Sequence, residues 1–553
     1  MFHTSEPSYL SYLLLFIATF VVVSADNANI TIPLNKTITL ADKELYGDFV
    51  TIKSNSVIRL SLTDINKYVH FIIFQVHSHL YNVTLYNNTL TQNSFISGTN
   101  IGLYGKVKPP DTYYVINNNT IDIKLYISIH GYRSSDPIPG GCNLEFPLYI
   151  SPFMYVKYTK DMISVDASSA QHPKDPDCLG VNKLITMKFY RLYLYERNFG
   201  EDSYFEGLRN MMTLAKIQEN GDEVPQTLRM KFLRRLLGAY PGTGSIYVAV
   251  AYHILNNSVY SIYVPTHTYA CSPLEGCEIL DDITSQFFCA ALFFIGLFIC
   301  YFGHRFFTTE MFLVGMFSGI LITYTIIPMW TDLDRPALLF ASGMSGIFMG
   351  AIWLLFWWFY GIPVLSVFLS TMYLGYVLAA IVYYRAPAGP TIFENDGTFW
   401  TIFVVLMLLT AVSLSPVTYL SNILCCAFLG AYATVFALDH YIGSNLKYIV
   451  INTMRRAVVE SFNNAVLAPP YQWRDAIATL LWVLLATSGF LFQHYHNRGK
   501  PPFPPPPRSI STRMPEPTSY GTIGNRGRRN VSVETGGDPT IVDYNTNERT
   551  PLL

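Results

Sequence analysis

The sequence predicts a multipass α-helical membrane protein, in which a seven-helix transmembrane bundle follows a β-rich, sandwich-like ectodomain on the luminal or extracellular side. The 553-residue chain is 50% hydrophobic and only 14% charged, whereas a typical soluble protein has about 25% charged residues. Long apolar runs gather between residues 284 and 496, and a helix needs roughly 20 such residues to cross a bilayer. The residues before these runs alternate in the manner of β-strands.

Changes in composition along the chain predict five regions. They are a signal peptide at 1–25, a sandwich-like ectodomain unit at 26–150, a second unit of mixed strands and helices at 151–283, the seven-helix domain at 284–496, and a disordered cytosolic tail at 497–553.

The first residues are typical of a secretory signal. An apolar run at 13–23 ends in Val23-Ser24-Ala25, which places small residues where signal peptidase cleaves. The mature chain is therefore expected to begin at Asp26. An uncleaved signal anchor is the alternative, because the segment contains no Lys or Arg, and it leaves the topology downstream unchanged.

Short segments rich in Val, Ile, Thr, Tyr and Phe make up the first ectodomain unit. They lie at 30–40, 49–62, 70–86, 112–115 and 120–132, separated by Asn, Gly and Pro. This pattern predicts an antiparallel sandwich. Residues 121–129 alternate almost perfectly, which predicts one face in a core and the other in solvent.

The second unit is expected to combine strands with helices. Its predicted strands are 183–195 and 245–263, and its predicted helices are 205–219 and 226–237.

Six Asn-x-Ser/Thr sequons precede the first apolar run and are predicted glycosylation sites. They are Asn29, Asn35, Asn82, Asn87, Asn118 and Asn256. A seventh sequon, at Asn530, lies in the expected cytosolic tail and should not be glycosylated.

Four of the eight cysteines, Cys142, Cys178, Cys271 and Cys277, lie in the ectodomain. An even number in an oxidising compartment predicts disulfides. Three pairings are open, and proximity along the chain favours Cys142–Cys178 with Cys271–Cys277. The other four cysteines fall inside apolar runs and are expected to be small packing residues.

Seven apolar runs define the predicted membrane domain. They cover residues 287–302, 311–330, 337–359, 362–384, 399–415, 417–438 and 476–493. With a luminal amino end, seven crossings place the tail in the cytosol, and the sequons, the signal and the cysteines set this orientation better than the Lys and Arg count. Plasma membrane and endolysosomal compartments both fit.

Glycines recur in the predicted second, fourth and sixth helices, at Gly315, Gly375 and Gly430. They predict close helix crossings and a plan of three hairpins plus a seventh helix. Before the last run, residues 445–468 carry apolar residues at helical spacing, with Arg455 and Arg456 on other faces. This predicts an amphipathic helix on the outer membrane surface or under the ectodomain.

Composition and motifs exclude several functions. A net charge of -1 and the lack of a long basic run argue against nucleic-acid binding. No HExxH, GxSxG or phosphate-binding glycine loop occurs, so no catalytic residue, metal or cofactor is expected.

Two alternatives stay open. An intramembrane metal-dependent hydrolase would use a zinc cluster of His304, Glu310, His494 and His496. A channel or transporter would need polar groups in mid-span, and the seven runs contain essentially no charged ones.

The tail carries three short motifs. Phe503 followed by Pro504, Pro505, Pro506 and Pro507 matches the core that EVH1 domains bind, and a stiff spacer is the alternative. Glu548 with Leu552 and Leu553 fits the acidic dileucine motif of clathrin adaptors, and Tyr520 with Ile523 fits the tyrosine-based motif.

Four stretches, taken together and in order, resemble the transmembrane 7 superfamily member 3 family over nearly the whole chain. They are PGGCNLEF at 139–146, PTHTYACS at 265–272, FGHRF at 302–306 and ERTPLL at 548–553. The region from Gly303 onward also resembles the membrane domain of the transmembrane protein 198 family.

The resemblance implies a multipass protein with a glycosylated ectodomain and no established enzyme activity. It also implies a link to cell survival, through negative regulation of programmed cell death, and to the response to unfolded-protein stress. It supplies no catalytic residues. The expected function is that of a non-enzymatic protein in membrane lipid, whose ectodomain binds an unknown ligand or protein and whose tail directs trafficking.

Overall fold

The computed structural model describes residues 28–504, except 40–41, 89, 92, 108–110, 180–183, 227–232, 278–282, 332 and 386–390. The chain divides into two compact units, 1–507 and 508–553. The predicted signal peptide lies outside the described residues, as do Pro505 to Pro507 and the sorting motifs at Tyr520, Ile523, Glu548, Leu552 and Leu553.

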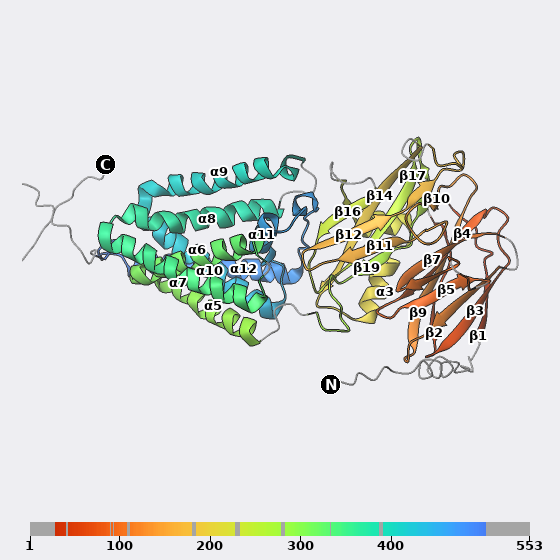
Figure 1. Ribbon diagram of the computed structural model, residues 1–553, viewed down its shortest axis with the longest axis horizontal. Coiled ribbons are helices and arrows are strands. Elements are labelled where there is room, and N and C mark those ends of the chain that lie inside the picture. The colour runs from red at the N-terminus through yellow and green to blue at the C-terminus, as the bar shows by residue number, and fades with distance from the viewer. Residues whose placement is uncertain are drawn as a thin grey trace, which may run out of the picture. The chain divides into compact units, whose positions relative to one another are not determined.

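Two sheets form the first ectodomain domain (Figure 1). Their strands are β1 (Ala28–Pro33), β2 (Glu44–Ile52), β3 (Ser56–Thr63), β4 (Phe71–Ser78), β5 (Val83–Asn87), β6 (Phe95–Gly98), β7 (Asn100–Lys106), β8 (Asp111–Asn117) and β9 (Ile123–Tyr132). One sheet has the order β1-β3-β8-β5-β6 and the other β2-β9-β4-β7. Buried apolar residues of both sheets, such as Leu60, Phe74 and Ile127, form one core.

Two details differ from the sequence prediction for this domain. Strand β1 pairs in parallel with β3, so the sandwich is not wholly antiparallel. Strand β9 is buried on both faces, including Ser128 and His130. The prediction of a solvent-facing side was wrong because a second domain covers it: Tyr126 of β9 belongs to the same buried cluster as Phe205 of that domain.

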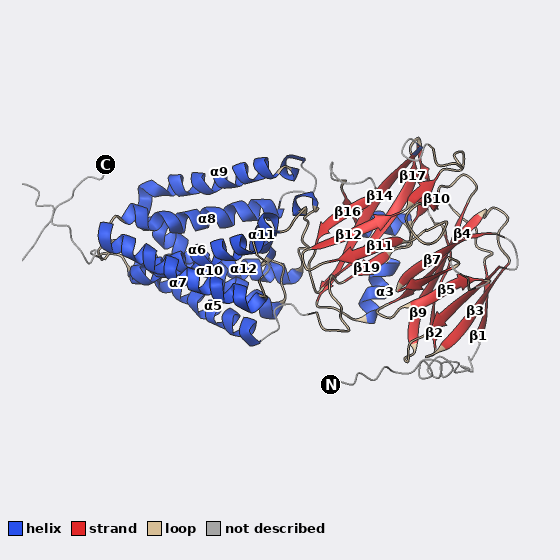
Figure 2. Cartoon of the chain, viewed as in Figure 1, coloured by secondary structure: helices blue, strands red, loops and turns tan. Residues whose placement is uncertain are grey.

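The second domain combines three sheets with two short helices (Figure 2). Its elements are β10 (Ile138–Cys142), β11 (Met154–Tyr158), β12 (Met162–Ala167), β13 (Ser169–Gln171), β14 (Ile185–Glu196), α3 (Glu201–Arg209), α4 (Leu214–Asn220), β15 (Asp222–Val224), β16 (Arg234–Gly238), β17 (Thr243–His253), β18 (Asn256–Ile262) and β19 (Thr266–Thr268). The largest sheet runs β15-β14-β17-β18, with β19 also paired to β17. It packs on the sheet β11-β12-β16 through residues such as Phe189 and Val165.

The helix predicted at 226–237 was wrong where the structure describes it. Residues Arg234–Gly238 form strand β16, which pairs with β12 and, at Leu237, with Val466 far along the chain. Backbone pairing on both sides satisfies the peptide groups of this segment, and such tertiary pairing overrides the helical preference of a short stretch.

Buried histidines and tyrosines join the two ectodomain domains. Asn100 Oδ1 of the first domain accepts from Tyr204 Oη of the second at 2.7 Å and lies 2.7 Å from His77 Nδ1. His79 bonds Tyr269 at 2.8 Å. Burial lowers the pKa of His77 and of His79 to about 4, so at neutral pH these side chains are uncharged.

Two disulfides brace the second domain and its exit. Cys142 is bonded to Cys178, and Cys271 to Cys277. The second bond closes a loop six residues long in sequence, just before the first membrane helix.

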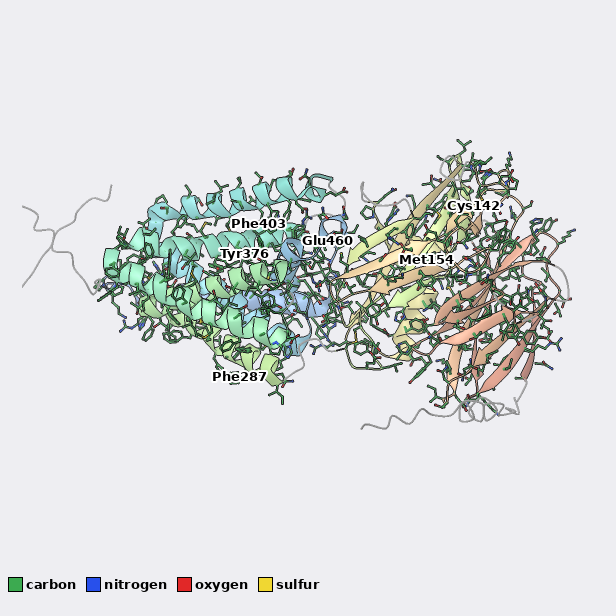
Figure 3. All side chains as sticks on the ribbon, viewed as in Figure 1. Cys142, Met154, Phe287, Tyr376, Phe403 and Glu460 are labelled. Atoms are coloured by element: carbon green, nitrogen blue, oxygen red, sulfur yellow. A yellow bond between two sulfur atoms is a disulfide. The ribbon has the colours of Figure 1, made fainter. Side chains whose placement is uncertain are left out.

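Seven long apolar helices and one shorter amphipathic helix follow. They are α5 (Ile283–Phe302), α6 (Phe307–Ile326), α7 (Arg335–Tyr360), α8 (Pro363–Arg385), α9 (Asp396–Leu414), α10 (Thr418–Ile442), α11 (Tyr448–Val458) and α12 (Trp473–His496). Aromatic contacts are common between them, as between Tyr376 of α8 and Phe403 of α9, whose ring centroids are 5.4 Å apart (Figure 3).

Five continuous helical stretches within the described residues are long and apolar enough to cross a membrane. Two of them, Gln286–Ile326 and Asp396–Ile442, are 41 and 47 residues long. Each contains two of the long helices with a short 3-10 turn between them. At 1.5 Å per residue, either stretch is about twice the thickness of the hydrocarbon core. Seven crossings remain the prediction.

The three glycines singled out in the sequence each lie at a helix crossing. A Cβ on Gly315 would lie 3.0 Å from Gly350 Cα of α7, and one on Gly375 would lie 2.6 Å from the Met407 carbonyl of α9. A Cβ on Gly430 would overlap the backbone of Cys300 in α5. In membranes, where helices associate through close van der Waals packing, such contacts replace the hydrophobic effect.

Replacing Gly430 with Ala is expected to destabilise the membrane domain by about 1–3 kcal/mol, because the added methyl group meets backbone that cannot rotate away. The measurement is the thermal melting of the purified full chain in detergent. Gly343→Ala is the matched control, since Gly343 is also in a membrane helix and has open space around it. Equal melting temperatures for the two variants would contradict the assigned crossing.

Candidate functional site at the junction of ectodomain and membrane domain

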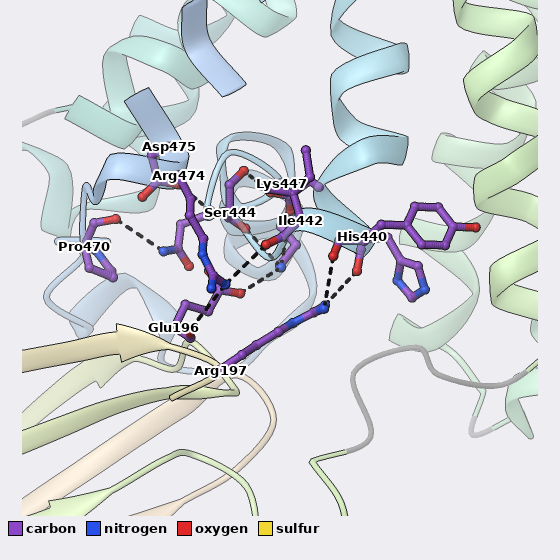
Figure 4. A network of polar contacts seen from close by, with 12 residues as sticks. Glu196, Arg197, His440, Ile442, Ser444, Lys447, Pro470, Arg474 and Asp475 are labelled. Carbon is purple, nitrogen blue, oxygen red and sulfur yellow. Dashed lines mark hydrogen bonds and ion pairs between the residues drawn. The ribbon is translucent and has the colours of Figure 1, made fainter. Parts of the chain in front are cut away.

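Polar side chains tie the second ectodomain domain to one end of the membrane helices (Figure 4). The ectodomain contributes the end of β14, the Lys160–Asp161 turn and β16. The membrane domain contributes the end of α10, helix α11, and the segment from Val459 to Gln472 before α12.

Helix α11 is the centre of the junction. Arg455 donates to Asp161 Oδ1 at 2.8 Å, to the Lys160 carbonyl at 2.7 Å and to the Ala239 carbonyl at 2.8 Å, all in the ectodomain. Its planar guanidinium suits several acceptors at once. Arg455 is buried against the ectodomain, and these three acceptors orient its guanidinium.

The neighbouring Arg456 points to the membrane helices instead. It donates to Asp396 Oδ1 at 2.9 Å and to the Phe393 carbonyl at 2.6 Å, both at the start of α9. Its guanidinium also lies 4.5 Å from the ring centroid of Phe399. Two adjacent arginines therefore connect α11 to opposite sides.

The end of α10 receives an arginine from the ectodomain. Arg197 donates to the carbonyls of His440 at 2.6 Å and Tyr441 at 3.4 Å. The last carbonyls of a helix lack internal partners and carry partial negative charge, which favours a cation there. Gly443 ends α10 with φ 74°, and a Cβ at this position would lie 3.0 Å from Arg197 Nε. Glycine thus permits both the turn and the approach of Arg197.

One buried lysine serves two carboxylates in this network. Lys447 Nζ lies 3.3 Å from Asp439 and 3.5 Å from Glu196. Burial alone lowers the pKa of Lys447, but the carboxylates, Asp439 first, raise it to about 12. Burial raises the pKa of Glu196 to about 7 against the pull of Lys447, and Asp439 adds to the rise. Glu196 therefore changes charge near neutral pH.

Backbone and amide contacts complete the junction. Val466 donates its N–H to the Leu236 carbonyl at 2.8 Å and accepts from Gly238 N–H at 3.2 Å. Gln472 accepts from the N–H of Glu196 at 3.1 Å and donates to the Leu194 carbonyl at 2.9 Å. The side-chain amide of Gln472 thus hydrogen-bonds to the backbone at the end of β14 as a neighbouring strand would. The junction can therefore carry a displacement of the ectodomain into α10, α11 and α12.

A groove of 680 Å³ opens between the two ectodomain domains. All of strand β6 lines one wall, and Met154, Tyr155 and Tyr158 of β11 line the other. Both strands are at the end of their sheet orders. Edge strands present unpaired backbone groups, and an extended peptide can add to them.

The structure separates the predicted zinc cluster. Asn422 Nδ2 bridges Glu310 Oε2 at 2.9 Å and His304 Nδ1 at 3.0 Å, whereas His494 and His496 are exposed and stack on Phe490 and Phe492. In the described residues no group of three His, Cys, Asp or Glu side chains could hold a metal. The proposed four-residue site was wrong because Gln493, not a histidine, faces the bundle and accepts from His304 N–H.

The predicted glycosylation sites are on the ectodomain surface, with one exception. Asn29, Asn35, Asn82, Asn118 and Asn256 are exposed. The half-buried Asn87 donates to Asp111 Oδ1 at 3.3 Å, which makes it the poorest acceptor of the six. Asn82 also lines the groove.

The first residues of the polyproline motif contact the membrane domain. Phe503 lies 5.1 Å from Phe307 and 5.6 Å from His304, by ring centroids, and it packs against the cluster that includes Trp357. The aromatic residue expected to bind an EVH1 domain is therefore already engaged, and Pro504 is only partly exposed.

The sequence predicted only part of the junction, namely an amphipathic segment on the outer membrane surface or under the ectodomain, and the structure docks this segment against the ectodomain. Residues 445–468 were predicted to form one amphipathic helix, with Arg455 and Arg456 on other faces. The helix ends at Val458, and both arginines are buried. Two adjacent arginines in a loop between apolar runs are unusual, and they are the feature of the sequence that could have indicated the junction.

Comparison with known proteins divides the chain into three matched regions. Residues 39–132 match the TM7SF3-like N-terminal immunoglobulin-like domain, and residues 137–274 match the TM7SF3-like second immunoglobulin-like domain. Residues 289–494 match the TM7S3/TM198-like domain.

Three curated relatives are similar over most of the chain. Transmembrane 7 superfamily member 3 from Homo sapiens, from Mus musculus and from Rattus norvegicus are 30%, 30% and 31% identical over 467 residues. The match covers 81% of this chain and 82% of each relative. A crystal structure of Aeromonas hydrophila PliG, a periplasmic lysozyme inhibitor, is similar over 19% of this chain and 98% of its own, at 8% identity and a TM-score of 0.14, which is too low to carry an argument.

Replacing Arg455 with Ala is expected to loosen the junction, because it removes the ion pair with the partly exposed Asp161 and two hydrogen bonds to backbone carbonyls, and a hydrogen bond from a charged group contributes about 1.5–3 kcal/mol. Hydrogen exchange of the full chain should rise in α11 and β16. Arg209→Ala is the control, since Arg209 is exposed on α3. Unchanged protection of α11 in the Arg455 variant would contradict this account.

Replacing Glu196 with Gln tests the charge at the junction. Burial raises the pKa of Glu196 in the folded chain to about 7, above the ordinary 4.5, so the folded state binds the proton more tightly and the wild type loses stability as the pH rises from about 4.5 to about 7. The variant should melt higher than the wild type at pH 8, and the difference should shrink as the pH falls through 7 to 5. A difference that does not vary with pH would refute the shift.

Proposed function

Because this chain belongs to the transmembrane 7 superfamily member 3 family, and its immunoglobulin-like ectodomain precedes multiple apolar helices, we propose that it is a non-enzymatic, receptor-like integral membrane protein. In this proposal the ectodomain binds a protein partner, and the junction transmits the binding event to the membrane helices. The output is cell survival, by negative regulation of programmed cell death, together with the response to unfolded-protein stress.

The junction is the observation that carries the proposal. A binding module that only tethers a partner needs a flexible link to the membrane. Here Arg455, Arg197 and Gln472 fix the ectodomain to three helical elements instead. Rigid contacts favour transmission between distant sites, because a displacement at one end then moves the groups at the other.

The groove between the two immunoglobulin-like domains is the proposed partner site. An extended segment of the partner would pair with β6 or β11, while the exposed rings of Phe95, Tyr155 and Tyr158 supply apolar contacts. Aromatic side chains provide large contact area at low entropic cost, which is why they dominate binding sites.

The tail is proposed to control trafficking between the plasma membrane and endolysosomes. The proposed orientation has a luminal amino end and a cytosolic tail, where Glu548, Leu552 and Leu553 would bind clathrin adaptors and Tyr520 with Ile523 would assist. An EVH1-domain protein would bind the polyproline motif only after Phe503 leaves the membrane domain, since that ring packs beside Phe307.

Survival under folding stress tests the receptor proposal. In cells that lack the chain and are treated with a glycosylation inhibitor, wild type and Arg209→Ala should lower caspase activation. Arg455→Ala, which breaks the junction, and Tyr155→Glu, which charges the groove, should not. Tyr149→Glu controls for the second change, because Tyr149 is 86% exposed and outside the groove lining. Full rescue by the junction and groove variants would reject the proposal.

Replacing Leu552 and Leu553 with Ala tests the trafficking part by itself. Loss of the two side chains that adaptors bind should raise the surface level and slow internalisation, measured with an antibody against the ectodomain. Pro551→Ala is the neighbouring control. Internalisation at the wild-type rate would show that the dileucine motif does not direct trafficking, and it would leave the receptor proposal unaffected.

A further inference from the structure

The membrane domain contains a cavity of 350 Å³. On α6 its lining residues are Glu310, Val314, Phe317, Ile320, Leu321 and Tyr324. Their spacings of three and four residues follow one face of a helix. Residues from α5, α8 and α10 close the other sides.

The cavity is long and narrow. From Glu310 to Tyr324 the helix rises roughly 21 Å, at 1.5 Å per residue. At the far end the lining includes Val450 and Met454 of α11. The volume of the cavity is near the low end of the ~300–1,000 Å³ range of ligand pockets, which suits one hydrocarbon chain lying along α6.

Polarity is concentrated at the end of the cavity near the α5–α6 turn. Glu310 and Ser370 both line it there, and Ser370 Oγ donates to Glu310 Oε1 at 3.2 Å. Asn422 Nδ2 donates to the other carboxylate oxygen at 2.9 Å. Both Glu310 and Asn422 are buried, at 3% and 0% exposure.

No ion pair joins Glu310 to a Lys, Arg or His in the described part of the chain. Its side-chain hydrogen-bond partners are the neutral groups of Asn422, Ser370 and Cys426, which leaves acceptor capacity unused, since a carboxylate accepts about four hydrogen bonds. A cation beside a buried carboxylate favours its charged form, and an ionisable group inside a membrane domain marks a functional site by default.

We propose that this cavity binds a single-chain membrane amphiphile with a protonated primary amine as its head group, such as a sphingoid base. The chain lies along the apolar face of α6. The ammonium group donates to the carboxylate of Glu310, which lines the cavity. An aminophospholipid is a poorer ligand, because its phosphate would lie near the same carboxylate.

The test is photolabelling of the purified full chain, in detergent, with an octadecyl primary amine that carries a diazirine in its chain. Labelling should map to peptides of α6, α8 or α10. It should fall at least fivefold in Glu310→Gln, which keeps the shape and removes the charge, and in Ala433→Trp, which fills the cavity and keeps the carboxylate. Glu460→Gln should label like the wild type, because Glu460 is exposed on the segment after α11 (Figure 3).

Competition decides the chemistry of the head group. Octadecylamine in excess should abolish labelling, whereas octadecanol and octadecanoate should not. Equal competition by octadecanol would overturn the cationic head, and undiminished labelling of both Glu310→Gln and Ala433→Trp would overturn the site. Thermal melting shows which variants are folded. If Glu310→Gln does not fold, the labelling of Ala433→Trp decides whether the site is correct.

Discussion

The architecture depends on the burial of two adjacent arginines in α11. A guanidinium removed from water costs several kcal/mol unless its donors are satisfied, and Arg455 and Arg456 satisfy theirs on opposite sides, one in the ectodomain and one at the start of α9. Neither domain supplies both sets of acceptors. The helix can therefore be buried only where an ectodomain sheet and the membrane bundle are both in place.

The other buried charges of the junction also share partners between the two domains. Lys447 is held between Asp439 of α10 and Glu196 of β14, so one cation stabilises carboxylates from two domains. Burial raises the pKa of Glu196 to about 7 in spite of the shared Lys447, so a small change in pH near neutrality alters the charge of the junction. Glu310 is the contrasting case, because its partners are the neutral amide of Asn422 and the hydroxyl of Ser370.

The sequence predicted the features that have a local signature. Membrane helices are visible as apolar runs because lipid requires apolar surface over their whole length, and Gly315, Gly375 and Gly430 marked crossings because only glycine lets two backbones approach so closely. The features that failed depend on distant partners. Strand β16 is a strand because β12 and Val466 pair with it, and the second face of β9 is buried because another domain covers it. Gln493 is buried on α12 whereas the neighbouring His494 and His496 are exposed, and only the packing of the bundle decides which of them faces inward.

The separation in sequence between the partners of the junction has a consequence for biosynthesis. Arg455 and Asp161 are 294 residues apart, so the ectodomain emerges and folds long before its docking helix has been made. During that interval the backbone groups at the ends of β14 and β16 lack the partners that Gln472 and Val466 later supply. Closure of the junction therefore requires that almost the entire chain, through the start of α12, has been synthesised.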